Sequence, residues 1–533
     1  MSSFLPGALL ALASLAPAAQ EPLLPPGPHP VGFRHTWAFD EGRVYRTAWD
    51  AGATYGAQKS ARPLLVLEWY PANLGLDPAP MAHGEYLAIG SDDPRLAQLS
   101  AALSAFARDV LVQQVLGKPE DELDEPGRAA LARVLAAPTP CHRGAHGAPG
   151  PFPVVLYHSG AGSSFEDNAA LCAYLASHGF VVLGGAFQEA DGSSLAVDAG
   201  PGSVADLQFL ARLAHGLPHA DARRIALVGH SAGAQAALRA AAQPGCAADA
   251  LVLLDTTQDY YGLALPLHES LVREVVEGRA HLTRPMLVAT GPEALFELMD
   301  TLTGAERAYL TVPGLGHDEY ISQGLQRLAR IEQGPRTAEE EAELARLAEV
   351  RGSYRILCET VRAFLEARLE RSEADFAARL ARDAARPWTP AAPHLVAVPR
   401  GVDGPEPWDP AGDAPPSPRQ FLRLFRTAGS AAACDVLRRF REHEPRGPLY
   451  ASTMLSGSLL YELASAGKGE EARAYLALLE ELDVRALSLF EFLATMSELR
   501  GKPEEARRFL RLVLELDPDH PGIAAKLKDL GGG

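Results

Sequence analysis

The sequence predicts an α/β fold, a mostly parallel sheet with helices on both faces, followed by an all-α region of helical repeats. Two observations carry this prediction. Between residues 153 and 312, short and wholly apolar runs alternate with helical segments, which is typical of parallel strands that helices bury on both faces. From residue 419 onward the chain is helical in pattern and contains an internal repeat.

Length and composition limit the possibilities. A chain of 533 residues is too long for one ordinary core, so two or more domains are expected. The 47% of apolar and 22% of charged residues are typical of a soluble globular protein. The net charge of −18 leaves no basic stripe to neutralise phosphates, which argues against a nucleic-acid partner.

The cysteines are scattered, without the paired spacing of a zinc or redox motif. They are Cys141, Cys172, Cys246, Cys358 and Cys434. Cys172 and Cys358 lie in apolar helical stretches, so we expect buried thiols there rather than disulfide partners. No metal is implied.

The N-terminal segment predicts export. Residues 1–20 are apolar, and Ala16-Pro17-Ala18 has the form of a signal-peptidase site, although the segment contains no Lys or Arg. A signal peptide over 1–20 implies a secreted or periplasmic protein. No other apolar stretch is long enough to span a bilayer, so no transmembrane segment is expected in the mature chain.

One α/β domain is predicted over residues 21–375. Its strands are expected at 64–70 (ended by Pro71), 154–157, 180–183, 224–228, 250–254, 285–289 and 308–312. Its helices are expected at 168–177, 204–217 and 354–369. Helical insertions are predicted near 90–140 and 320–350, and the first of them is either a lid over a site or a surface helix pair.

The most informative motif is Gly229–Gly233, with the sequence Gly-His-Ser-Ala-Gly. It lies between a predicted strand and a helical run, and the order strand, G-x-S-x-G, helix is that of a nucleophile elbow. The sharp turn holds the serine hydroxyl clear of the backbone, and the glycines let the strand and the helix approach each other. The helix N-terminus favours developing negative charge. Ser231 is therefore the predicted nucleophile.

A serine nucleophile needs a base within hydrogen-bond reach and an acid that orients the base. His317 is the predicted base because it lies in a Gly-flanked loop straight after the last strand. Asp255, which ends the first strand after the serine, is the favoured acid, since a carboxylate there is costly to desolvate without a partner. Glu293 is the alternative acid and Asp259 a weaker candidate. The alternative role for Asp255 is a helix N-cap.

Stabilising the oxyanion requires two preorganised backbone N–H groups. One is expected from Ala232, the residue after the serine. The other is expected from the Gly-rich loop at 158–164, where glycines let the backbone turn its amides inward. No phosphate-binding glycine motif follows that loop, so no nucleotide or other cofactor is expected.

The C-terminal region carries the internal repeat. The run Gly467–Arg473 recurs 34 positions later at Gly501–Arg507, and Ala472 and Ala506 occupy equivalent places, where two helices would cross closely. The period and the small residues resemble the tetratricopeptide repeat. Residues 419–533 are thus predicted to hold such repeats and to offer a surface for a protein partner; the alternative is an unrelated helical bundle.

A linker is predicted between the two regions. Residues 376–418 are rich in Pro, Gly and Asp, a composition typical of loops. Such a linker would let the repeats be removed near Arg386 without unfolding the first domain.

Several segments together resemble the platelet-activating-factor acetylhydrolase branch of the α/β-hydrolases, which shades into dienelactone-hydrolase-like enzymes. The matching stretches are 30–32, 69–72, 152–162, 175–180, 229–233 and the strand that ends at Asp255. The resemblance implies Ser231 as nucleophile, Asp255 as acid and His317 as base. It also implies an oxyanion hole formed by the backbone amides of Gly160 and Ala232.

The chain departs from that family in three respects, one of which is that the appended helical repeats are not part of the family core. The oxyanion loop has His158-Ser159-Gly160 where the family has His-Gly, and Ala232 stands where this branch often has a bulky aromatic residue. The resemblance therefore implies cleavage of a small-molecule or lipid-like carboxylic ester through an acyl-enzyme, more firmly than it implies a phospholipid. The alternatives are a thioesterase, a dienelactone hydrolase, a peptidase, or an inactive hydrolase fold that serves as a binding scaffold.

Overall fold

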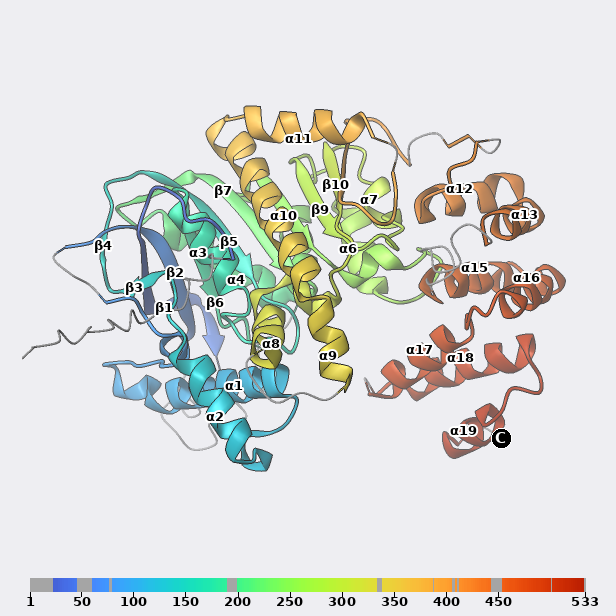
Figure 1. The fold of residues 1–533 in the computed structure, drawn as a ribbon, viewed down its shortest axis with the longest axis horizontal. Helices are drawn as coiled ribbons and strands as arrows, with labels where there is room; N and C mark the ends of the chain where they lie inside the picture. The colour runs from blue at the N-terminus through green and yellow to red at the C-terminus, as the bar shows by residue number, and fades with distance from the viewer. Residues whose placement is uncertain are drawn as a thin grey trace, which may run out of the picture.

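The structure is a computed structural model, and it shows an α/β region beside a C-terminal group of helices (Figure 1). It describes residues 23–45, 60–75, 79–188, 199–332, 338–386, 388–404, 408–409, 412–441, 453–499 and 501–531. The signal peptide predicted over residues 1–20 lies outside the described residues. In the part of the chain that the structure describes, no helix is both long and apolar enough to cross a membrane.

An 11-stranded sheet forms the centre of the α/β region. Its strands are β1 (Val31–Tyr45), β2 (Ser60–Asn73), β3 (Cys141–Arg143), β4 (His146–Gly147), β5 (Phe152–His158), β6 (Val181–Gly185), β7 (Ala220–His230), β8 (Ala250–Leu254), β9 (Met286–Thr290), β10 (Arg307–Thr311) and β11 (His394–Val398). They lie in the order β11-β10-β9-β8-β7-β5-β6-β2-β1-β3, and β4 pairs with β2. The strands from β6 to β10 in this order are parallel, whereas β2 and β11 run antiparallel to their neighbours.

Helices cover both faces of this sheet, over two separate apolar cores. On one face lie α3 (Ala169–Ser177) and α10 (Leu347–Leu365), and on the other lie α4 (Pro201–Ala214), α5 (Ala232–Ala242), α6 (Glu269–Glu277) and α7 (Glu297–Asp300). Along β5, Val155 enters the first core while Val154 and Leu156 enter the second, because successive side chains of a strand point to opposite faces. The predicted α/β fold class is confirmed.

Both predicted insertions are helical. The first contains α1 (Ala97–Leu116) and α2 (Glu125–Ala136), and the second contains α8 (Ser322–Glu332) and α9 (Ala338–Ala345). Helix α1 packs against α8, so the two insertions meet although they are far apart in the sequence (Figure 1). Cys172 and Cys358 are buried and free of disulfides, as predicted.

The predicted linker at 376–418 is wrong in part. Helix α11 (Ala374–Ala384) covers its beginning, and β11 adds a strand antiparallel to β10. Leu395 and Val398 of β11 enter the two cores, which holds this Pro-flanked segment in the sheet. Strand β2 also continues beyond Pro71, because β6 pairs with β2 only as far as Trp69 and a missing N–H is tolerated where one neighbour is absent.

The C-terminal region consists of helix pairs. Its helices are α12 (Pro418–Ala428), α13 (Ser430–Arg441), α15 (Thr453–Ser465), α16 (Gly469–Glu481), α17 (Ser488–Leu499), α18 (Pro503–Leu516) and α19 (Ile523–Asp529). Helices α16 and α18 begin at equivalent positions of the sequence repeat, and Ala472 and Ala506 are fully buried in them. Small side chains thus occupy the predicted close-packed positions, while the assignment to the tetratricopeptide family stays a prediction.

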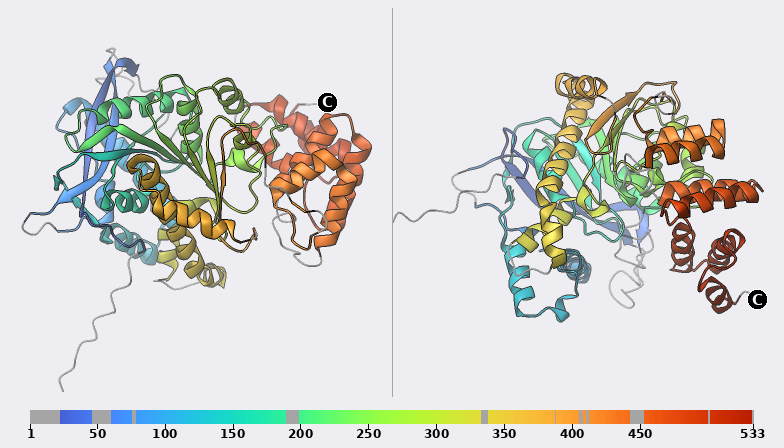
Figure 2. Two further views of the ribbon diagram at one scale, coloured as in Figure 1. Left: turned by 90° about the horizontal axis from the view of Figure 1, so that it is seen from above. Right: turned by 45° about the vertical axis from the view of Figure 1, so that its right-hand side comes forward.

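This helical region packs directly against the α/β region, contrary to the separable unit that the linker suggested (Figure 2). Tyr261, Leu265 and Leu295, all from the α/β region, belong to the apolar core of the C-terminal helices. The Gly262 N–H donates to Ser458 Oγ on α15 at 3.1 Å. The physical reason is that some apolar side chains of the loops after β8 and β9 pack into the core of these helices and not into the two cores of the sheet.

Polar contacts reinforce the same interface. Arg419 of α12 pairs with Asp300 of α7 at 2.7 Å and lies over the Tyr309 ring, 4.4 Å from its centroid. Arg426 pairs with Glu297 at 2.6 Å. Since Arg419 and Asp300 are largely buried, separating the regions would strand charged groups that are costly to leave unpaired.

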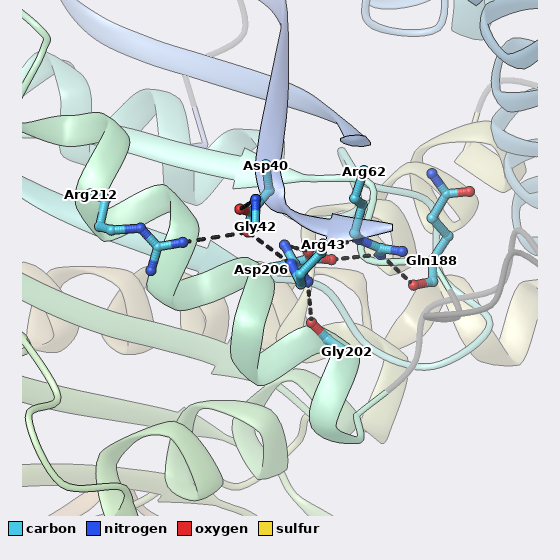
Figure 3. A network of polar contacts seen from close by, with 8 residues as sticks. All are labelled: Asp40, Gly42, Arg43, Arg62, Gln188, Gly202, Asp206 and Arg212. Carbon is cyan, nitrogen blue, oxygen red and sulfur yellow. Dashed lines mark hydrogen bonds and ion pairs between the residues drawn. The ribbon is translucent and has the colours of Figure 1, made fainter. Parts of the chain in front are cut away.

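A buried ion-pair network ties the β1–β2 pair to α4 (Figure 3). Arg62 and Arg43 both donate to the fully buried Asp206, at 2.8 and 2.6 Å. Arg62 also donates to the carbonyl of Gln188, after β6, at 2.9 Å, and Arg43 pairs with Asp40. Two cations sharing Asp206 compensate the cost of burying its charge, and the network fixes the chain at the carboxyl end of β6.

Candidate active site

Ser231 lies on a sharp turn between β7 and α5, at φ 53° and ψ −118°. A non-glycine residue held at positive φ stores backbone strain, which is typical of functional turns. The flanking glycines are sterically required: a Cβ at Gly229 would lie 2.3 Å from the Gly233 carbonyl, and one at Gly233 would lie 2.1 Å from the His158 oxygen. The Ser231 N–H donates to the Leu254 carbonyl of β8 at 2.9 Å. The turn is that of a nucleophile elbow.

The structure brings Ser231, His317 and Asp255 together in one hydrogen-bonded chain. His317 begins the short helix η5 (His317–Tyr320) after β10; its Nε2 lies 3.0 Å from Ser231 Oγ, and its Nδ1 lies 2.7 Å from Asp255 Oδ2. Because a carboxylate only accepts, Nδ1 carries the proton and Nε2 is left to accept from the serine hydroxyl. Asp255 is 4% exposed and also has positive φ, 43°.

The charges around His317 favour its role as a base. Burial disfavours the protonated imidazole, but the hydrogen bond and the charge of Asp255, with a contribution from Asp318, outweigh this and raise the pKa of His317 above its ordinary value of 6.5. A more basic imidazole accepts the serine proton more readily.

Neither alternative acid has a hydrogen bond to His317 among the described residues. Glu293 follows β9 near Asp255, and burial together with the Asp255 charge raises the pKa of Glu293, but no hydrogen bond joins it to His317 among the described residues. Asp259 is fully buried in η4 (Thr257–Tyr260). Burial and the charges of Asp255 and Asp300 raise the pKa of Asp259 well above its usual range.

Sequence reasoning missed two residues that orient the site. Tyr260 donates its hydroxyl hydrogen to Asp255 Oδ1 and accepts from the Gly291 N–H at 2.8 Å. His230, the second residue of the elbow motif, places Nε2 3.1 Å from the His317 carbonyl and its ring 4.8 Å from the His317 ring. Burial, aided by the His317 charge, lowers the pKa of His230 to about 3, so His230 is neutral and donates to that carbonyl. The sequence signal that could have pointed to His230 is its position directly before Ser231 in the G-x-S-x-G motif.

The oxyanion loop differs from the prediction at Gly160. Its N–H donates to Asp167 Oδ2 at 3.3 Å, so this amide faces a buried carboxylate and is not free for an oxyanion. The next amide, that of Ala161, makes no hydrogen bond to any described residue, and the same holds for Ala232 at the start of α5. Gly160 still lies against Ser231, because a Cβ at Gly160 would be 3.3 Å from Ser231 Cβ.

An open groove begins beside this loop. It has a volume of about 620 Å³ and lies between α1, the residues after it and Gly162. Gly162 has φ 71°, and a Cβ there would meet nothing within 4 Å. Asp109 and Asp121 are among the groove's polar lining. Among the described residues, no group of three His, Cys, Asp or Glu side chains could hold a metal ion.

The matches of this chain to known proteins lie among solved structures. No family model and no curated protein matches the chain, whereas 188 chains of solved structures match it. One of them is a ferulic acid esterase from Streptomyces cinnamoneus, with 20% sequence identity and a TM-score of 0.41 over 64% of this chain and 90% of that one. At that identity and score, the match assigns no substrate to the present chain. The parallel sheet, its helices and the serine elbow define an α/β-hydrolase fold.

Proposed function

We propose that this protein is a serine hydrolase that cleaves carboxylic esters through an acyl-enzyme. The observation that carries the proposal is the chain of hydrogen bonds from Ser231 Oγ through His317 to Asp255, with distances of 3.0 and 2.7 Å, built on a strained elbow. Nucleophile, base and orienting acid are thus within the reach that this chemistry needs.

The proposed reaction has two halves. His317 Nε2 takes the Ser231 proton as Oγ attacks the ester carbonyl, and the protonated imidazole then gives that proton to the departing alcohol. Water, deprotonated by His317, attacks the acyl-enzyme; collapse of the second intermediate releases the acid and returns the proton to Ser231. Asp255 stays ionised and stabilises the imidazolium in both halves.

For the oxyanion we propose the N–H groups of Ala232 and Ala161. Both are without partners among the described residues, whereas Gly160 is engaged by Asp167. Donors that are aimed before the reaction stabilise the developing charge at no reorganisation cost.

The alcohol part of the substrate is proposed to occupy the groove beside Gly162. Gly160 touches the nucleophile, and Gly162 is two residues farther along, at most about 7 Å away. Acidic side chains in the groove repel a polyanionic leaving group. The groove therefore supports a neutral ester over an acyl-coenzyme thioester or a phospholipid.

Three finer assignments belong to the same proposal. The acetylhydrolase-like branch is supported by the sequence segments that match it, the tetratricopeptide assignment by the repeat at Ala472 and Ala506, and export by the N-terminal segment. N-terminal sequencing of the protein recovered from the culture medium or periplasm tests export, since a mature chain that has lost the signal peptide predicted over residues 1–20 is expected.

Labelling with a fluorophosphonate probe tests the function. The wild-type chain should label at Ser231 and should hydrolyse short neutral aryl esters, and Ser231→Ala should do neither. A panel with a thioester, a dienelactone and a peptide separates the alternatives. Failure of the wild-type chain to label would favour a binding scaffold and would overturn the proposal.

A further inference from the structure

Two adjacent buried residues, Asp167 and Asn168, lie between the oxyanion loop (residues 158–164) and the His317 loop (residues 317–323). They follow β5 and precede α3, and both are 0% exposed. Their side chains lie outside the Ser231–His317–Asp255 chain. A buried carboxylate is expensive unless hydrogen bonds satisfy it, so its partners indicate what it does.

The Asp167 carboxylate holds the oxyanion loop. Oδ1 accepts from the Tyr157 hydroxyl at 2.7 Å, and Oδ2 accepts from the Gly160 N–H at 3.3 Å. Tyr157 and Gly160 bracket the turn that leads to Ala161. Both carboxylate oxygens are therefore used to set the path of the backbone that presents the Ala161 amide.

The same two residues hold the segment that follows His317. The Asp167 carbonyl accepts from the Gln323 N–H at 3.0 Å and from Ser322 Oγ at 3.1 Å. The Asn168 side chain accepts from the Ser322 N–H at 3.1 Å and donates to the Tyr320 carbonyl at 3.3 Å. Both the oxygen and the nitrogen of the Asn168 side-chain amide thus bind backbone groups at the end of η5 and the start of α8.

A third element anchors the pair. The Tyr354 hydroxyl of α10 donates to Asn168 Oδ1 at 2.5 Å. Helix α10 belongs to the first core of the sheet. The Tyr354 hydrogen bond therefore ties the pair to the core of the fold and not only to the surface insertions.

We infer that Asp167 and Asn168 are positioning residues that set the oxyanion loop and the His317 loop relative to each other. This inference rests on the proposed function, because it assigns the pair to the reaction of Ser231. The two residues act through Gly160 and through residues 320–323, and neither touches the reacting atoms.

Each side chain controls one loop, and this division makes the inference testable. In Asp167→Asn, a neutral amide replaces the carboxylate: if the amide oxygen keeps the Gly160 N–H, the NH₂ group must donate to the Tyr157 hydroxyl, and the Gly160 hydrogen bond loses its charged acceptor. The oxyanion loop should loosen, and kcat should fall about 10- to 100-fold, which is less than the roughly 100- to 1000-fold effect of removing an oxyanion donor outright. KM should stay within about twofold, because the oxyanion exists only in the transition state.

In Asn168→Asp, the oxygen that accepts from Ser322 remains, but the donation to the Tyr320 carbonyl is lost. This variant should loosen residues 317–323 and leave the oxyanion loop protected. Hydrogen exchange followed by mass spectrometry on peptides covering 157–165 and 315–325 separates the two effects.

Asp383→Asn is the matched control. Asp383 is also a buried acid that accepts from a backbone N–H, that of Leu395 at 3.0 Å, but it lies on α11, outside the site. It should change neither kcat nor exchange in the two loops. If Asp167→Asn fails to fold, Tyr157→Phe removes one partner of the carboxylate and should lower kcat about two- to tenfold.

The outcomes are distinct. Wild-type activity with unchanged kcat and unchanged loop exchange in Asp167→Asn and Asn168→Asp overturns the inference and spares the proposed function. Equal loosening of both loops by either variant, or by Asp383→Asn, also overturns it, since that indicates general destabilisation. A wild-type chain without esterase activity or probe labelling overturns the proposed function and the inference together.

Discussion

The α/β region and the C-terminal helical region differ in where their unusual backbone lies. In the α/β region, His268, Phe296 and Arg371 have positive φ at helix ends. Ser231 and Asp255, by contrast, hold positive φ angles of 53° and 43° at the ends of neighbouring strands. In the helical region, Asp483 has φ 60° in the turn after α16, an ordinary place for helix termination. Backbone strain at two strand ends that meet in one hydrogen-bonded chain is typical of a functional site. Positive φ at a helix end is typical of an ordinary turn.

The two regions nevertheless meet beside Asp255, the proposed acid. Tyr260 binds Asp255, and its neighbours Tyr261 and Gly262 pack against or bind the C-terminal helices. The helical region therefore covers the loop that holds the acid. Substitutions and truncations in each region separately would show how far the site depends on its contact with the C-terminal helices.

The largest effect is expected at the elbow itself. Ser231→Ala should lower kcat/KM by about 10⁵-fold or more, while thermal unfolding of the whole chain stays near that of the wild type, because alanine fits the turn. Steady-state kinetics and a melting curve check both parts. Residual activity above a thousandth of the wild type would place the nucleophile elsewhere.

The next effect concerns the two acids at adjacent strand ends. Asp255→Asn should lower kcat about 10⁴-fold, since His317 is then held in the wrong tautomer. Glu293→Gln should stay within about twofold of the wild type, because Glu293 has no hydrogen bond to His317 among the described residues. A reversed ranking of these two variants in kcat would move the acid to the end of β9.

Removing the helical region should affect stability more than chemistry. A chain that ends at Arg386 loses β11 as well as the cover over Tyr261 and Leu265, and we expect insoluble protein. A chain that ends at Gly404 keeps β11 but leaves Asp300 without Arg419, a loss of about 3–5 kcal/mol for a buried pair. Melting temperatures and soluble yields of the two truncations measure the difference; two fully stable truncations would contradict the shared core.

A smaller effect is expected at the contact between the two regions. Tyr260→Phe removes a hydrogen bond to a charged group, worth about 1.5–3 kcal/mol, so kcat should fall about 10- to 100-fold with KM nearly unchanged. Tyr309→Phe, which removes a tyrosine hydroxyl bonded to Asp300 at 2.8 Å, is the matched control for kcat. Equal losses in the two variants would show that Tyr260 acts through stability alone.

The smallest expected effect is a displacement of the pH profile. His317 must be neutral to accept the serine proton, and Asp255 raises its pKa above 6.5. The acid limb of kcat/KM should therefore have its midpoint above pH 6.5, with activity falling as pH decreases through that value. A pH series on a neutral ester checks the sign, and a midpoint below 6.5 would contradict the coupling to Asp255.

The sequence alone determined the fold class and the placing of three site residues. Apolar runs of strand length predicted the parallel sheet, because burial on both faces leaves no polar alternation. The elbow motif and the strand ends predicted Ser231, Asp255 and His317, since residues at the carboxyl ends of neighbouring parallel strands meet at one edge of the sheet. These inferences depend on short-range pattern and on chain order, which a sequence displays directly.

Only the tertiary structure decided the choice between Asp255 and Glu293, the role of Gly160 and the relation of the two regions. The first depends on which carboxylate comes within 2.7 Å of His317 Nδ1, and the second on an acceptor, Asp167, that turns the Gly160 amide inward. The relation of the two regions depends on β11, which lies within the predicted linker at 376–418, and on Arg419, which directly follows it. Each rests on contacts between side chains distant in sequence, and such contacts are set by packing rather than by local propensity.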